Sequence, residues 1–138
     1  MRDANPPAIT FRMKAGRITI FRSTLSAIGY PEFYRFLYNP ERRQIAIEPC
    51  EMDAPGSYAG VKKDDTYEIS SIDLLRMLYR DNGWKNELSY RVPGLAYSDE
   101  RIVEFDLTKA MEIIDGKVQE SDVAVDFDTE EDDTIEII

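Results

Sequence analysis

Alternation of apolar and polar residues dominates the first part of the chain and predicts β-strands. Ile9 and Phe11 alternate with polar neighbours, and Ile18 and Ile20 repeat the pattern after a short Lys-Ala-Gly segment. Successive side chains of a strand point to opposite faces, so each stretch has one apolar face. Gly16 can adopt the positive φ of a tight turn. We therefore predict an antiparallel hairpin that turns at Gly16.

Further strands follow the same logic along the chain. Residues 33–38 are apolar on both faces, which favours a strand that is covered on both sides. An Asn-Pro turn separates this segment from residues 44–49, whose isoleucines alternate again. Residues 88–97 and 102–107 show the same alternation, so we predict a second hairpin in that region.

Helical spacing is clear in one segment only. Ile72, Leu75 and Tyr79 recur on one face of a helix that Ser70 caps and Gly83 ends. Two shorter helices are predicted, a single turn over residues 23–29 and another over residues 108–114.

These elements predict an α+β fold of antiparallel β-hairpins with one main helix, in a single domain over residues 1–114. Residues 51–66 contain Pro, Gly and clustered charge and are the best internal linker. Each side of this linker contains a strand, a helix ending in Gly, a Tyr-Arg-apolar strand, a turn ending in Glu-Arg and another strand. Two readings stay open, a duplication into β-α-β-β halves over 8–50 and 66–114, and a chance likeness.

Charge divides the chain unevenly although the net charge is -10. Residues 1–49 carry eight basic and four acidic groups, a difference of +4, whereas residues 115–138 carry ten acidic groups and one lysine, a difference of -9. The low apolar content and self-repulsion of residues 115–138 predict an acidic, disordered tail. Its last apolar residues have β preference, and we predict that they bind a sheet edge of this chain or of a partner: Ile135, Ile137 and Ile138.

Composition argues against several kinds of chemistry. The chain has no histidine and one cysteine, Cys50, so histidine-based catalysis and an internal disulfide are excluded. No apolar run is long enough to cross a bilayer, and the first residues lack the apolar core of a signal peptide. We predict a cytoplasmic protein that is not an enzyme and has no metal or cofactor. A carboxylate enzyme stays open as a minor alternative, with acidic clusters at 64–65 and 130–133.

Residues 16–49 resemble the swapped-hairpin domain of AbrB-type transition-state regulators. The matching pieces are the Gly-Arg strand at 16–20, the Thr-Leu to Gly segment at 24–29 and the Ile-Ala-Ile strand at 45–47. This chain has Phe21-Arg22 where the family usually has proline, and it is far more acidic. The resemblance implies a homodimer that binds DNA through basic residues of its N-terminal hairpin.

The leading functional hypothesis is therefore a DNA-binding transcriptional regulator. The residues that we predict to contact double-stranded DNA are Arg12, Lys14, Arg17 and Arg22. Basic side chains pair with phosphates and release counterions, so such binding weakens with salt. Two alternatives stay open: an acidic protein–protein interaction module or nucleic-acid mimic, and a hairpin whose basic residues only keep it soluble.

Overall fold

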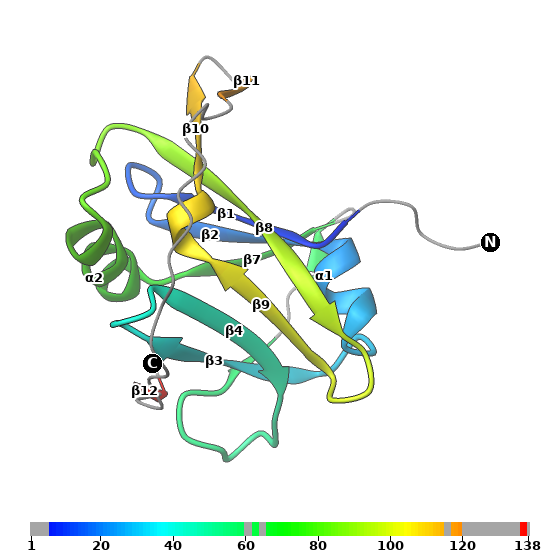
Figure 1. Cartoon of the computed structure of the whole chain (residues 1–138). Helices are drawn as coiled ribbons and strands as arrows, with labels where there is room; N and C mark the ends of the chain where they lie inside the picture. The colour runs from blue at the N-terminus through cyan, green and yellow to red at the C-terminus, as the bar shows by residue number, and fades with distance from the viewer. Residues whose placement is uncertain (1–5, 60–61, 64–65, 115–116, 120–135, 138) are drawn as a thin grey trace.

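The computed structural model describes residues 6–59, 62–63, 66–114, 117–119 and 136–137 (Figure 1). These residues form a mostly antiparallel β structure. The elements in chain order are β1 (Ala8–Arg12), β2 (Arg17–Phe21), α1 (Arg22–Ala27), β3 (Phe33–Asn39), β4 (Gln44–Pro49), β5 (Tyr58–Ala59), β6 (Lys62–Lys63), β7 (Thr66–Ser70), α2 (Ile72–Asn82), β8 (Ser89–Tyr97), β9 (Ile102–Asp106), the 3-10 turn η1 (Leu107–Lys109), β10 (Met111–Ile114), β11 (Lys117–Gln119) and β12 (Glu136–Ile137).

The strands curl into a nearly closed barrel. The main path runs β3-β4-β9-β8-β1-β2-β7-β6, and all these neighbours pair antiparallel. β5 pairs with β3 at one end of this path, and β6 pairs with β7 at the other. Because β5 and β6 are close in the chain, this segment brings the two ends of the sheet together.

The interior of the barrel holds the apolar faces of the strands, and a helix covers each end. Ile9 and Phe11 of β1 and Ile18 and Ile20 of β2 are fully buried, as the alternation predicts. α1 follows β2 and contributes Leu25 to the core at one end. At the other end, beside the β1–β2 turn, α2 contributes four buried side chains: Leu74, Leu75, Leu78 and Tyr79. In Figure 1, α2 lies at the left of the barrel and α1 at the right, with the strands between them.

The predicted α+β class is wrong, because the molecule is a barrel-like β-sheet to which the helices are added as caps. The segment 51–66, predicted as a linker, contains β5 and β6, which close the sheet. Residues 108–114, predicted as a helix, form the end of η1 and β10. These strands have only two to four residues each, which is too short for local periodicity to reveal them.

The two stretches considered as β-α-β-β halves, 8–50 and 66–114, share one interleaved sheet. β1 lies between β2 and β8, β2 pairs with β7, and β4 pairs with β9, so the two sides of the predicted linker interleave. The pairing itself has a two-fold relation. Each strand of the first half has a counterpart in the second: β1 corresponds to the β5/β6 segment, β2 to β7, β3 to β8 and β4 to β9. When counterparts are exchanged, the order of neighbouring strands around the barrel stays the same. The repeating unit is thus β-β-α-β-β, and neither copy can close a barrel alone.

Most of the predicted acidic tail, residues 115–138, lies outside the described residues. Its described parts are β11, which pairs with β10, and β12, which pairs with β3. Neither described helix is long and apolar enough to cross a membrane.

Candidate anion-binding face

The outer surface of β8, β1 and β2 gathers basic and hydroxyl side chains on one face. Thr10 lies opposite Thr19 on β2 and opposite Arg91 on β8, and Arg12 lies opposite Arg17. Paired residues of antiparallel strands share a face, and so do residues two apart on one strand. Since Ile9 and Phe11 point into the core, this set points outward. We call it the outer basic face: Thr10, Arg12, Arg17, Thr19, Phe21 and Arg91.

Arg12 and Arg17 are a pair of like charges directly opposite each other, an arrangement that normally destabilises a sheet. Arg17 donates from Nη1 to Glu68 Oε1 at 2.9 Å, but half of its side chain is exposed, so solvent screens this ion pair. Arg12 has no carboxylate within salt-bridge distance among the described residues. The face therefore keeps a net positive charge in a protein that is acidic overall.

Arg91 crosses the face from β8 to β2. Its guanidinium carbon lies 4.9 Å from the centre of the Phe21 ring, two strands away. The side chain must therefore pass over β1, where Thr10 is its cross-strand neighbour. The Nε of Arg91 is buried and has no hydrogen-bond partner in the described structure. The cation–π contact with Phe21 therefore positions the Arg91 guanidinium among the described residues.

Two buried hydroxyls lie beneath these side chains. Thr10 is 0% exposed and Thr19 is 5% exposed, and neither Oγ1 has a hydrogen-bond partner within the described part of the chain. Thr24 shows the usual arrangement, because its Oγ1 donates to the carbonyl oxygen of Ala8 at 2.8 Å and accepts from the Ala8 amide at 2.9 Å. Native proteins rarely leave buried polar groups unpaired.

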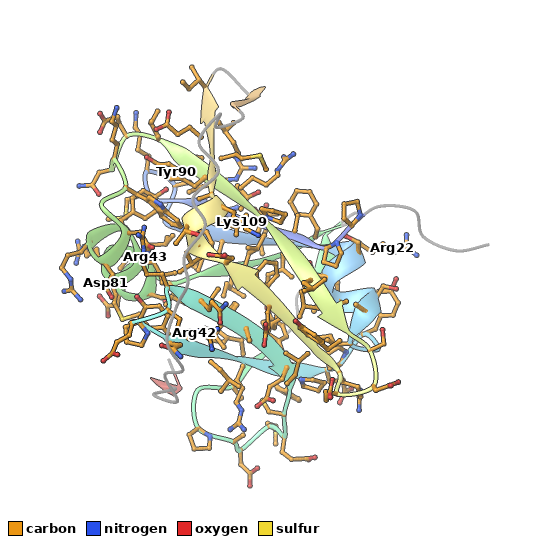
Figure 2. All side chains as sticks on the ribbon, in the orientation of Figure 1. Arg22, Arg42, Arg43, Asp81, Tyr90 and Lys109 are labelled. Atoms are coloured by element: carbon orange, nitrogen blue, oxygen red, sulfur yellow. The ribbon has the colours of Figure 1, made fainter. Side chains whose placement is uncertain are left out.

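The structure brings three of the four predicted DNA-contacting residues to one end of the β1–β2 hairpin. Arg12 ends β1, Lys14 is exposed in the turn, and Arg17 begins β2. Arg22 lies beyond the other end of β2, on α1, where its Nε donates to the Tyr30 hydroxyl at 3.1 Å. Figure 2 shows Arg22 at α1, on the opposite side of the view from Arg43 and Asp81. The basic residues therefore form one group of three and one separate cation.

Four members of the face were missed by sequence reasoning: Thr10, Thr19, Phe21 and Arg91. The two threonines lie two residues from Arg12 and Arg17 on the same strands, so they share a face with them. The alternation within the hairpin is enough to predict this. Arg91 joins them only because β8 pairs with β1, which no local pattern reveals.

The predicted partner-binding isoleucines fall mostly outside the described residues. Ile135 and Ile138 are not described, and Ile137 pairs with Leu37 at the edge of β3. This pairing lies within the chain's own sheet. Binding of a partner by these residues stays a prediction.

A second basic group lies near the α2 end of the barrel, where Figure 2 shows Arg42, Arg43 and Lys109. Arg43 donates from Nε to Asn82 Oδ1 at 2.8 Å, so it is engaged in a structural contact. The Nε of Arg42 is buried without a hydrogen-bond partner among the described residues. Among the described residues, the buried hydroxyls without partners are Thr10, Thr19 and Tyr34, and none of Arg42, Arg43 and Lys109 is paired in register with any of them.

Other chemistry has little support among the described residues. They contain no group of three or more Cys, Asp or Glu side chains placed to hold a metal ion. Cys50 is partly buried after β4, and burial raises the pKa of its thiol, which disfavours the reactive thiolate.

Comparison of the chain with protein families, with curated proteins and with solved structures finds no match. The resemblance of residues 16–49 to AbrB-type regulators therefore stays a prediction.

Proposed function

We propose that this protein is a non-catalytic, DNA-binding protein that holds the phosphate backbone of a duplex on its outer basic face. The observation that carries the proposal is the placement of Arg12 directly opposite Arg17. A polyanion lying between these cations relieves their mutual repulsion, which the described carboxylates relieve only at Arg17.

The overall acidity of the chain limits where on its surface DNA can bind. A net charge of -10 repels a nucleic acid over most of the surface, so attraction is confined to a locally basic face. Three strands span roughly 10 Å across their axes, which places Arg17, Arg12 and Arg91 within reach of adjacent phosphates. Contacts of this kind position a protein on DNA without reading its sequence.

Charge-reversal variants test the proposal. The test variant is Arg12→Glu with Lys14→Glu, and the matched control is Arg76→Glu with Lys85→Glu, which makes the same charge change on or just after α2. Binding of a fluorescent duplex is followed by anisotropy across a salt series from about 50 mM, where phosphate contacts are strong. We expect binding by the wild type and the control, with a salt dependence that the test variant lacks.

Two outcomes contradict the proposal. One is the absence of duplex binding by the wild-type protein at the lowest salt. The other is equal loss in test and control variants, which indicates a general charge effect. A third variant, Arg42→Glu with Lys109→Glu, examines the second basic group, and loss of binding there alone would relocate the interface.

A second candidate function is protein–protein interaction, which a separate apolar surface favours. Leu95 and Tyr97 on the outer side of β8 are 60% and 40% exposed, and Ile102 lies opposite Tyr97 on β9. Contiguous exposed apolar residues often mark a binding surface. If the partner is a second copy of the chain, light scattering will show a dimer that Leu95→Asp converts to a monomer. A wild-type monomer at all concentrations contradicts this homodimer.

A further inference from the structure

The outer basic face concentrates hydrogen-bond donors that lack acceptors. Five buried side-chain polar atoms of the described residues have no partner, and three of them lie on this face: Thr10 Oγ1, Thr19 Oγ1 and Arg91 Nε. A hydroxyl can donate or accept, but an arginine nitrogen only donates. The nearest carboxylate by register, Glu68 opposite Thr19, is hydrogen-bonded to Arg17. The face therefore has spare donors around a positive charge and needs a group that accepts.

We propose that the two threonine hydroxyls and Arg91 form a seat for one phosphate group, with Arg12 and Arg17 neutralising its charge. The inference rests on the proposed function in one respect, which is that the phosphate belongs to a DNA backbone. A phosphate oxygen only accepts hydrogen bonds, and a planar guanidinium with adjacent hydroxyls matches its geometry. In this proposal, the seat is the part of the outer basic face that contacts a phosphate most closely.

Arg91 covers the seat when no ligand is bound. Its side chain passes over Thr10, and its guanidinium lies against the Phe21 ring. No acidic group of the described residues forms a salt bridge with it. A phosphate can therefore draw the guanidinium away from Phe21 and uncover Thr10, whose cross-strand neighbour is Thr19. The same arginine then changes from a cover into a ligand.

The two hydroxyls without partners allow the hydrogen-bonding contribution to binding to be measured separately from the contribution of charge. In the variant Thr10→Val with Thr19→Val, shape and charge are kept and only the two hydroxyls are lost. We expect its affinity for a short duplex to fall about a hundredfold, which is about tenfold for each lost hydrogen bond to a charged group. The slope of affinity against salt should stay unchanged, because no cation is removed. The variant Thr10→Ser with Thr19→Ser keeps the hydroxyls and should restore binding.

Stability without ligand gives a second readout and a check on folding. Removal of unpaired buried hydroxyls should raise the Tm of the valine double variant. Thr24→Val is the matched control: its hydroxyl has two partners, so its loss should lower the Tm without changing the affinity for the duplex. Inorganic phosphate is then added at constant ionic strength. It should raise the Tm of the wild type more than that of the valine variant, beyond the general salt effect that both share.

The outcomes separate the seat from the proposed function. Equal duplex binding by the wild type and the valine variant overturns the seat and leaves the DNA-binding proposal standing. No duplex binding, with a phosphate-dependent Tm difference between the two proteins, keeps the seat but assigns it to free phosphate and overturns DNA binding. An equal response of both proteins to phosphate and to duplex, or no response, overturns the seat.

Discussion

Arg43 and Arg101 occupy matching positions in two hairpins, and each contacts the C-terminal end of a helix from the other half of the chain. Arg43 turns between β3 and β4 with φ 55°, and Arg101 turns between β8 and β9 with φ 56°. Arg43 donates to Asn82 Oδ1 on the last residue of α2, and Arg101 donates from Nη2 to the carbonyl oxygen of Ile28 just after α1 at 3.1 Å. A cation at the C-terminal end of a helix complements its unpaired carbonyl groups.

These two contacts connect each half of the chain to the other. Loss of either contact should destabilise the fold, and the effect of one loss should not depend on the other. Arg43→Ala and Arg101→Ala should each lower the free energy of unfolding by about 1 kcal/mol. The backbone strain of positive φ is the same for alanine and arginine, so it cancels in the comparison. Urea unfolding of both single variants and the double variant measures the effects, which should add because the sites lie at opposite ends of the barrel. Single variants as stable as the wild type would contradict this role.

Gly94 allows β8 to approach β9 closely. A Cβ at this position would lie 2.7 Å from Phe105 Cε1 and 2.8 Å from Val103 Cγ1, both in the core. Gly94→Ala should therefore lower the free energy of unfolding by about 1–3 kcal/mol through overpacking. Gly16→Ala is the comparison, because its Cβ meets nothing within 4 Å and only the φ of 67° opposes it. Its cost should be about 1 kcal/mol, and a smaller cost at Gly94 than at Gly16 would contradict the packing argument.

The hydroxyl of Tyr79 joins α2 to the barrel and makes stability depend on alkaline pH. It donates to the carbonyl oxygens of Leu88 (2.6 Å) and Phe11 (3.0 Å) in alternation, and accepts from the Met13 amide. Burial raises the pKa of Tyr79 to about 12. Since this folded-state pKa exceeds the unfolded value of 10.0, the contribution is complete below pH 10 and is lost as the pH rises through 12.

The expected loss is about 2 kcal/mol over that window, followed by urea unfolding at successive pH values. Tyr79→Phe should be less stable than the wild type near pH 8 by about 1–3 kcal/mol, because it leaves its partners unpaired. It should also lose less stability between pH 10 and 12. Parallel pH profiles for the two proteins would show that Tyr79 is not the group responsible.

Tyr34 is the contrasting case within the same core. Its hydroxyl is buried and has no hydrogen-bond partner among the described residues, and burial strongly raises its pKa. Tyr34→Phe should therefore leave stability unchanged or raise it by about 1 kcal/mol. Thermal unfolding measures this difference. A loss well above 1 kcal/mol would indicate that the hydroxyl is paired in solution, for example with buried water.

The sequence patterns predicted individual elements well but not how they join. The β1–β2 hairpin, the positive φ of Gly16 and the end of α2 at Gly83 are confirmed, because each depends on neighbouring residues. The predicted cap at Ser70 is wrong, because Ser70 is the last residue of β7 and Ser71 precedes the helix. Barrel closure depends on two-residue strands in a polar segment, which lack any periodic signal.

The same division holds for the candidate site. Arg12 and Arg17 follow from the resemblance of the N-terminal hairpin to AbrB-type regulators, and the hairpin that carries them is confirmed. Arg91 and the unpaired state of Thr10 and Thr19 depend on β8 lying beside β1, a contact between distant segments of the chain. Neither composition nor charge distribution predicts such a contact.

Mapping a duplex onto the backbone amides tests the central claim most directly. A short DNA duplex is titrated at about 50 mM salt into isotope-labelled protein, and amide chemical shifts are followed by NMR. We predict shifts confined to β1, β2, their turn and the first half of β8, which disappear at about 0.5 M salt. Absence of shifts, or shifts centred on α2 or on β9 and β4, would contradict the outer basic face as the site of DNA binding.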